Sequence, residues 1–165
     1  MNYILVDKEN TFHCQLLEEL MMAYVAETDM HRNISTPKDL IPKIAKSMVN
    51  KLDCNRILVV VTDGNSGAGF CYAKIDRVGD RGMIRPDWGY VMELFVSPQY
   101  RKNGVGRNLV NICEKFFREN GASNVWLTAD SVTGIPFWIA CGYSDSNEVS
   151  SENGQKIMTK HLNFV

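Results

Sequence analysis

Apolar residues recur every three or four positions in three stretches of the chain, a spacing that places them on one face of a helix. The predicted helices cover residues 11–26, 37–52 and 104–120. Thr36 is predicted to cap the second helix, with Pro37 at its first position, and Gly121 to end the third. The polar stretch 27–35 between the first two helices is predicted to be a loop.

Shorter runs of β-branched and other apolar residues are typical of strands. The predicted strands cover residues 3–7, 56–63, 68–75, 90–96 and 125–129, followed after a short helix at 134–141 by a closing hairpin of 143–149 and 155–162. This order predicts an α/β fold with a mixed sheet and helices on both faces, in a single domain covering residues 1–165. A long polar link at 76–89 joins two of the strands, and loops of this length are often functional.

The composition narrows the class of protein. An apolar share of 45% over 165 residues suits a soluble globular domain with a sizeable core. A net charge of −1 argues against a general nucleic-acid surface, and no apolar run is long enough for a membrane span or a signal peptide. The five cysteines form no C-x-x-C pair and the three histidines are far apart, so we expect reduced thiols, a cytoplasmic location and no metal.

The stretch 90–110 carries the candidate chemistry. The apolar run 90–96 stops at Ser97-Pro98, because proline cannot donate to a strand ladder. A basic, glycine-bearing turn follows and leads directly into a helix. The first N–H groups of a helix lack internal partners and attract anions, so this turn predicts a site for phosphate.

Two motifs in this part of the chain resemble those of a known family. Arg101-x-x-Gly104-x-Gly106, after Glu93-x-Phe95-x-Ser97-Pro98, resembles the acetyl-CoA motif of the GNAT superfamily of N-acetyltransferases. Phe137-Trp138-x-x-x-Gly142-Tyr143 is similar to the Tyr-x-x-x-Gly-Phe that the family carries near its C-terminus. The resemblance implies a mostly antiparallel sheet of about seven strands, splayed between the fourth (90–96) and the fifth (125–129), with about four flanking helices.

The same resemblance implies acetyl-CoA, or another short acyl-CoA, as co-substrate. The turn amides would hold the pyrophosphate, the backbone near Phe95 and Val96 would pair with the pantetheine arm, and nearby cations would add positive charge. The residues predicted to bind it are Phe95, Val96, Arg101, Lys102, Asn103, Gly104, Val105, Gly106, Arg107, Ser131 and Trp138. Ser131 stands where many relatives have an asparagine facing the pantetheine, and a helix cap before Gly134 is the alternative for it.

The implied reaction is direct transfer of an acetyl group to a primary amine of a small molecule or peptide, within a ternary complex. Glu93 is the candidate base, because it is the one carboxylate in an apolar strand and burial would raise its pKa. An ion pair with a lysine or arginine at a strand edge is the alternative for Glu93.

The general acid is not assigned by the sequence. Trp138 stands where many relatives have an acidic tyrosine, and its indole is predicted to pack on the pantetheine or acetyl end. Tyr143, Tyr90 or solvent is left to protonate the thiolate. The rival hypothesis is a non-catalytic acyl-CoA-binding sensor, and a homodimer is possible by analogy with relatives.

Overall fold

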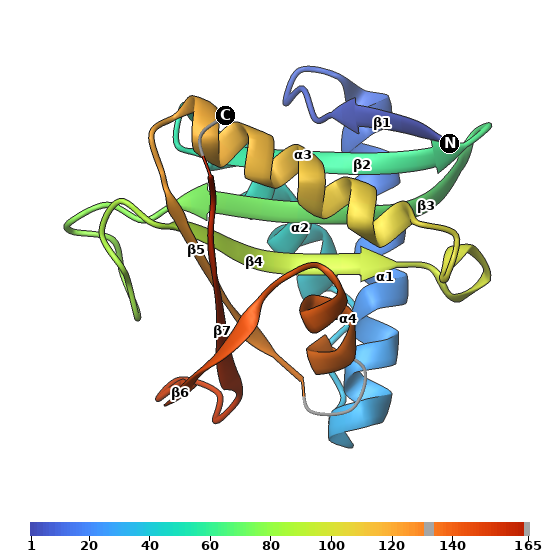
Figure 1. Ribbon diagram of the computed structural model, residues 1–165. Coiled ribbons are helices and arrows are strands. Elements are labelled where there is room, and N and C mark those ends of the chain that lie inside the picture. The colour runs from blue at the N-terminus through green and yellow to red at the C-terminus, as the bar shows by residue number, and fades with distance from the viewer. Residues whose placement is uncertain (131–133, 164–165) are drawn as a thin grey trace. The chain divides into compact units, whose positions relative to one another are not determined.

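The computed structural model describes residues 1–130 and 134–163 (Figure 1). The chain divides into two compact units. The first unit consists of Met1–Tyr72 and Glu93–Leu109, and the second of Ala73–Met92 and Val110–Val165. Two strands and one helix run through both units, because each boundary falls inside an element. Each unit is described below by itself.

The described residues form seven strands and four α-helices. The strands are β1 (Asn2–Leu5), β2 (Arg56–Asp63), β3 (Ser66–Ile75), β4 (Gly89–Val96), β5 (Asn124–Ala129), β6 (Ser144–Val149) and β7 (Lys156–His161). The helices are α1 (Thr11–Arg32), α2 (Leu40–Asn50), α3 (Val105–Glu119) and α4 (Gly134–Ala140), with a 3-10 turn, η1 (Pro98–Tyr100). The sheet order is β1-β2-β3-β4-β5-β7-β6, with β4 and β5 parallel, and this confirms the predicted mixed, mostly antiparallel sheet.

In the first unit, α1 packs against α2 and against β2. The six residues from Ile57 to Thr62 are all buried, which explains why β2 is a continuous apolar run without alternation. Its antiparallel pairing with β1 places Tyr3 opposite Val61. The helices contribute one buried stripe each, formed by Leu16, Leu17, Leu20 and Met21 of α1 and by Ile41, Ala45, Met48 and Val49 of α2.

The predicted loop 27–35 is wrong over most of its length, because α1 continues to Arg32. The helix ends at Asn33, whose φ of 52° is left-handed and whose N–H donates to the Asp29 carbonyl. The Asp29 carboxylate in turn accepts the Thr36 N–H at 2.6 Å and the Thr36 hydroxyl at 2.8 Å. Thr36 is therefore not a helix cap as predicted, and α2 begins at Leu40 after Asp39.

In the second unit, β5 pairs with β7 over six residues, from Asn124 opposite His161 to Ala129 opposite Lys156. Strand β6 pairs with β7 through a register irregularity between Asp145 and Val149. The described core of this unit includes Trp126, Leu127, Phe117, Ile157, Met158 and Leu162, all at most 1% exposed.

Strands β4 and β5 are registered through Gly89 with Val125 and Tyr90 with Trp126. Both pairs lie at the amino-terminal ends of the two strands. The predicted separation of β4 from β5 further along, and the single domain over residues 1–165, stay predictions. Among the described residues, no helix combines the length and the apolar character needed to cross a membrane.

Gly69 of β3 sets how closely β3 approaches the end of β4. A Cβ at Gly69 would lie 2.5 Å from the carbonyl oxygen of Phe95, and backbone oxygen cannot move aside as a flexible side chain can. Beside this contact, the Ser97 N–H donates to the Ala68 carbonyl at 2.9 Å. The absence of a side chain at Gly69 therefore allows the end of β4 to lie this close to β3.

We expect Gly69→Ala to lower the free energy of unfolding by about 2 kcal/mol, because the added methyl group forces the two strands apart. Urea denaturation followed by circular dichroism measures this. Ser66→Ala, at an exposed position of the same strand, is the control and should change stability by less than about 0.5 kcal/mol. Equal effects of the two substitutions would show that the close approach does not constrain β4.

Candidate active site

Glu93 lies in β4, within the first unit, and its partner is a tyrosine. The Tyr24 hydroxyl of α1 donates a hydrogen bond to the Glu93 Oε2. The Tyr24 ring is held by Phe70 and Phe95, each with its ring centroid 5.7 Å away. Among the described residues, the register of β4 with β5 covers Gly89 and Tyr90 and does not reach Glu93, so the alternative of an ion pair at a strand edge stays a prediction.

Burial raises the pKa of the Glu93 carboxyl above its ordinary value, and the Tyr24 hydrogen bond and the Arg32 charge offset part of that rise. Burial also raises the pKa of Tyr24 far above its ordinary value, and the neighbouring Glu93 charge adds to this. Tyr24 therefore stays protonated and acts as a donor to Glu93. The sequence pattern placed Tyr24 in the apolar stripe of α1 and did not predict a role for its hydroxyl. The one signal for such a role was that a tyrosine at a core position needs a hydrogen-bond partner for its hydroxyl.

Arg101 follows η1 and ties the start of the glycine-bearing turn to two elements of the first unit. Its Nε donates to the Val96 carbonyl at 2.8 Å, and an Nη donates to both carboxylate oxygens of Glu27 at 2.8 and 2.6 Å. Its guanidinium carbon also lies 5.9 Å from the centroid of the Phe95 ring. The side chain of Arg101 thus braces β4 and α1, and its predicted role toward a cofactor stays a prediction.

The turn over residues 101–104 contains two residues with a left-handed backbone. Lys102 and Gly104 have left-handed φ values of 62° and 79°, and a Cβ at Gly104 would meet no atom within 4 Å. Glycine is therefore favoured at 104 for its backbone conformation. The Asn108 N–H donates to the Gly104 carbonyl at 3.0 Å, so the amides of Val105 and Gly106 precede the first hydrogen bond of α3.

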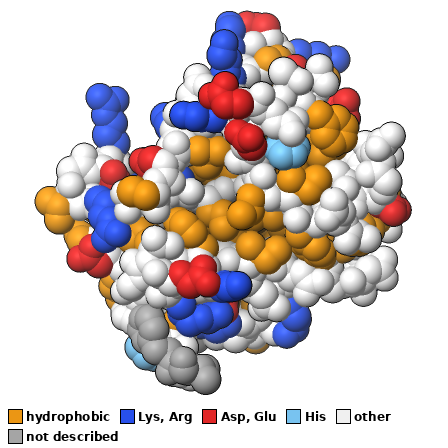
Figure 2. Space-filling model, turned by 90° about the horizontal axis from the view of Figure 1, so that it is seen from above, with side chains coloured by type: hydrophobic (Ala, Val, Ile, Leu, Met, Phe, Trp, Pro, Cys, Tyr) orange, Lys and Arg blue, Asp and Glu red, His pale blue; other side chains and the backbone are white. Residues whose placement is uncertain are grey.

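The charged side chains of this turn are exposed, as a phosphate site requires. Lys102, Asn103, Gly104 and Arg107 are exposed, whereas Val105 is buried and anchors the helix. Figure 2 shows that basic and acidic side chains are interspersed on the face it presents, in keeping with the net charge of −1.

Trp138 and Tyr143 lie together in the second unit. Trp138 is 6% exposed, and the rings of Phe137 and Tyr143 meet it edge-on, each with its centroid 5.0 Å away. The Lys160 ammonium lies 5.4 Å from the Tyr143 ring centroid and is bound by the Glu114 carboxylate and the Cys141 carbonyl. Both predicted site residues are core aromatics of α4 and the segment after it, and their roles stay predictions. Ser131 lies outside the described residues.

Tyr90, the other tyrosine among the candidate acids, is stacked on Trp126 in the second unit, with 4.0 Å between ring centroids and 8° between planes. The Trp126 indole N–H donates to Asp76 at 2.7 Å. Asp76 is fully buried and also accepts the Arg85 N–H at 2.9 Å, while the Lys74 ammonium lies 3.0 Å away. Asp76 thus fixes the long link 76–88 at its start, a role that the sequence did not reveal.

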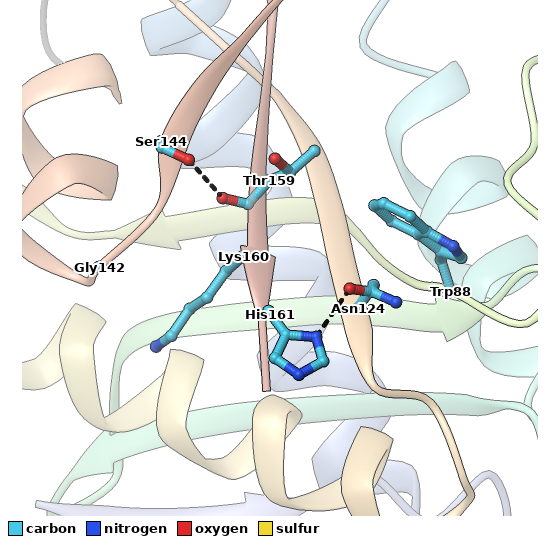
Figure 3. Close-up of a pocket in the computed structure, with 7 residues that line it drawn as sticks. All are labelled: Trp88, Asn124, Gly142, Ser144, Thr159, Lys160 and His161. Carbon is cyan, nitrogen blue, oxygen red and sulfur yellow. Dashed lines mark hydrogen bonds between the residues drawn. The ribbon is translucent and has the colours of Figure 1, made fainter. Parts of the chain in front are cut away.

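A pocket of about 350 Å³ is found in the second unit (Figure 3). It is lined by Trp88, Asn124, Gly142, Ser144, Thr159, Lys160 and His161, and none of the predicted site residues is among them. The His161 Nδ1 lies 3.0 Å from the Asn124 side-chain oxygen, and the Lys160 side chain extends away from Trp88. Within residues 1–130 and 134–163, no group of three or more His, Cys, Asp or Glu side chains is placed to hold a metal ion.

Similar proteins share this fold. A crystal structure of an aminoglycoside 6′-N-acetyltransferase complexed with coenzyme A has a TM-score of 0.75 at 18% identity, covering 100% of this chain and 99% of the other. The PaiA N-acetyltransferase of Thermoplasma acidophilum, in complex with coenzyme A, has a TM-score of 0.69 at 14% identity, covering 98% and 100%. A curated relative, the probable N-acetyltransferase HLS1 of Arabidopsis thaliana, is 37% identical over 83 residues, which is 46% of this chain and 21% of that relative.

The sheet contains a parallel β4–β5 pair, and a glycine-bearing turn leads from β4 and η1 into α3. The model of the acetyltransferase (GNAT) family matches residues 16–143, so this chain belongs to the GNAT family of acetyltransferases. The family predicted from the two motifs is confirmed. The chain spans about a fifth of the length of the curated relative it matches.

The raised pKa of Glu93 predicts a pH-dependent cost to stability. The folded state holds the Glu93 proton more tightly than the unfolded state, so its contribution is fully present below the unfolded pKa and is lost as the pH rises through the folded pKa. Glu93→Gln has no such titration. We therefore expect the free energy of unfolding of Glu93→Gln, relative to the wild type, to rise as the pH increases from the unfolded pKa of a glutamate through the raised folded pKa of Glu93, by about 1.4 kcal/mol for each unit of raised pKa.

Urea titrations of both chains at several pH values measure this difference. Glu19→Gln, at an exposed position of α1, is the matched control and should follow the wild type at every pH. Parallel pH profiles for Glu93→Gln and the wild type would show that Glu93 ionises as freely in the folded chain as in the unfolded one.

Proposed function

We propose that this chain transfers an acetyl group from acetyl-CoA to a primary amine of a small molecule or peptide, by direct attack within a ternary complex. The observation that carries the proposal is the order of three features in one unit. A carboxyl of raised pKa lies in β4, an exposed basic turn follows, and the turn leads into the first N–H groups of α3, which have no partner within the helix. A base and an anion cradle at adjoining positions are what acyl transfer from a nucleotide-bearing donor needs.

The residues of the turn fit the nucleotide end of acetyl-CoA. The amides around Asn103 to Gly106 precede or open α3 and would hold the pyrophosphate, with Lys102 and Arg107 supplying positive charge. The coenzyme supplies an activated thioester. Two similar structures are complexes with coenzyme A, which supports this donor. Other short acyl-CoA molecules share the same nucleotide end and fit the same turn.

Glu93 is proposed to remove the proton that blocks the amine. An amine is largely protonated near neutral pH and cannot attack until it loses a proton. A carboxyl with a raised pKa accepts that proton more readily than an ordinary exposed one. The new C–N bond then forms as the C–S bond of the thioester breaks and coenzyme A leaves as its thiolate. The second proton that the nitrogen loses goes to that thiolate or to water, and backbone N–H groups near Phe95 and Val96 are proposed to polarise the carbonyl.

The acceptor is proposed only as a class. One similar structure is an aminoglycoside acetyltransferase, so aminoglycosides belong in a panel beside polyamines, amino acids and peptides. The rival proposal, a non-catalytic acyl-CoA sensor, is favoured by Trp138 at the position of the expected acid tyrosine and by its burial among aromatic rings. A cytoplasmic location and a homodimer stay predictions.

The cofactor half of the proposal predicts that Gly104→Val binds acetyl-CoA at least about tenfold more weakly, because a β-branched residue is strained at a φ of 79° and the turn must rearrange. Isothermal titration calorimetry measures the affinity. Lys115→Ala, at an exposed position further along α3, is the control and should bind as the wild type does. Unchanged affinity in Gly104→Val would place the nucleotide elsewhere.

The catalytic half predicts that Glu93→Gln loses about 10²- to 10⁴-fold in kcat, the usual contribution of a general base, while its acetyl-CoA affinity stays within about twofold. Release of free coenzyme A thiol with the amine panel measures turnover. Tight binding by the wild type without turnover on any amine would support the sensor in place of the enzyme.

A further inference from the structure

We propose that Tyr24 is a positioning residue for Glu93: its hydroxyl holds the carboxylate through Oε2 and leaves Oε1 to receive the proton of the acceptor amine. This inference rests on the proposed function and adds to it a residue that neither motif contains. Among the described residues, Oε1 of Glu93 accepts no hydrogen bond, whereas Oε2 is bound by Tyr24.

The Tyr24 ring is built into the core of the first unit, and this fixes where its hydroxyl points. Phe70 meets it edge-on at 82° and Phe95 lies tilted at 52°, with both ring centroids 5.7 Å away. Phe70 and Phe95 are themselves buried, at 0% and 4% exposure. A tyrosine has few rotatable bonds, so packing of its ring on two sides determines the place of the hydroxyl.

A second contact holds the same part of α1 against β4. Glu27 lies three residues after Tyr24, on the neighbouring position of the same helix face, and binds Arg101 just beyond the end of β4. Arg101 also binds the last carbonyl of the strand, at Val96. The helix is thus fastened to β4 at Glu93 and again after Val96, which restrains Tyr24 along the strand.

The surroundings of the pair contain few other charges. From α1, Tyr24 and Arg32 act on the Glu93 carboxyl, and from β3 and β4 the neighbours of Tyr24 are the uncharged rings of Phe70 and Phe95. A hydrogen bond donated to a carboxylate favours its ionised form, so Tyr24 opposes the effect of burial. The carboxylate is then both oriented and kept able to accept a proton.

The proton transfer that this geometry serves is balanced. An N–H bond of the acceptor ammonium breaks and an O–H bond forms at Oε1, so the carboxylate becomes a neutral acid and the amine gains its lone pair. Tyr24 keeps its own proton throughout. The Tyr24 hydrogen bond is stronger to the ionised carboxylate than to the acid. Tyr24 therefore contributes by setting the pH above which the Glu93 carboxyl is ionised and can accept a proton.

Tyr24→Phe tests the role, since it removes the hydroxyl and keeps the ring between Phe70 and Phe95. Loss of a hydrogen bond to a charged group is worth about a factor of ten in the ionisation equilibrium, so the acidic limb of the pH profile of kcat should move up by about one pH unit. We expect kcat at neutral pH to fall about tenfold, with acetyl-CoA affinity within about twofold of the wild type. Tyr3→Phe, which removes the hydroxyl bonded to Asn108, is the matched control and should change neither value.

The outcomes separate this inference from the proposed function. Loss of turnover in Glu93→Gln together with an unmoved pH limb and full kcat in Tyr24→Phe overturns the role of Tyr24 and leaves the function standing. Absence of turnover in the wild type with every amine overturns the function. In that case carboxyl ¹³C NMR of Glu93 still tests whether Tyr24 binds the carboxylate, because the titration of Glu93 must move to higher pH in Tyr24→Phe.

Should Tyr24→Phe not fold, the wild-type chain provides the answer. The Tyr24 hydroxyl proton should give a downfield NMR signal that exchanges slowly with solvent and is lost in Glu93→Ala. A signal unaffected by Glu93→Ala, or none in the wild type, overturns the proposed contact.

Discussion

A half-buried carboxylate in an otherwise apolar strand is costly unless a donor satisfies it, and the Tyr24–Glu93 contact meets that need in this chain. Much of the first unit is arranged around it. Helix α1 runs on to Arg32, so its last turns lie where Tyr24 reaches Glu93 and Glu27 reaches Arg101. A helix ending at residue 26 would carry Tyr24 in a fraying last turn, and the position of its hydroxyl would be poorly held.

The turn before α3 shows a related constraint on the backbone. Lys102 adopts a left-handed φ of 62°, a conformation that costs a residue with a side chain roughly 1 kcal/mol or more. The bonds of Arg101 to Val96 and Glu27 hold the start of the turn and offset that cost. Strained backbone held by its surroundings is found mostly at functional positions. The left-handed φ of Lys102 is therefore compatible with a binding turn, although Asn33 adopts the same conformation where it ends a helix.

The sequence predicted the parts of the fold that depend on local pattern. The continuous apolar run of β2, the amphipathic face of α3 and the closing hairpin all lie within a few residues of where periodicity placed them. It failed where a polar side chain had a distant partner. Glu27 and Asp29 suggested a loop because they are charged, yet Glu27 binds Arg101 and Asp29 ends the helix by binding Thr36.

The candidate site divides in the same way. Glu93 stood out as a lone carboxylate in an apolar strand, and the glycine positions of the turn followed from motif spacing. Tyr24 and Asp76 gave no such signal, because a tyrosine in a helix stripe and an aspartate after a strand are common. Their roles depend on partners 69 and 50 residues away, which no local pattern encodes.

Trp138 stands where a tyrosine acid is expected, and this is weaker evidence against catalysis than Glu93 is evidence for it. An alkyl amine with a pKa near that of lysine is deprotonated in only on the order of one molecule in a thousand at neutral pH, so removal of its proton is a large requirement. A thiol is far more acidic than an amine, with a pKa of about 8.5 for cysteine, and a thiolate can leave and take its proton from water. A chain that keeps the base and lacks the usual acid therefore retains the harder half of the proton chemistry. Tyr24 and Glu93, which lie in one unit, are proposed to supply that half whether or not Tyr143 or Tyr90 takes part in the other.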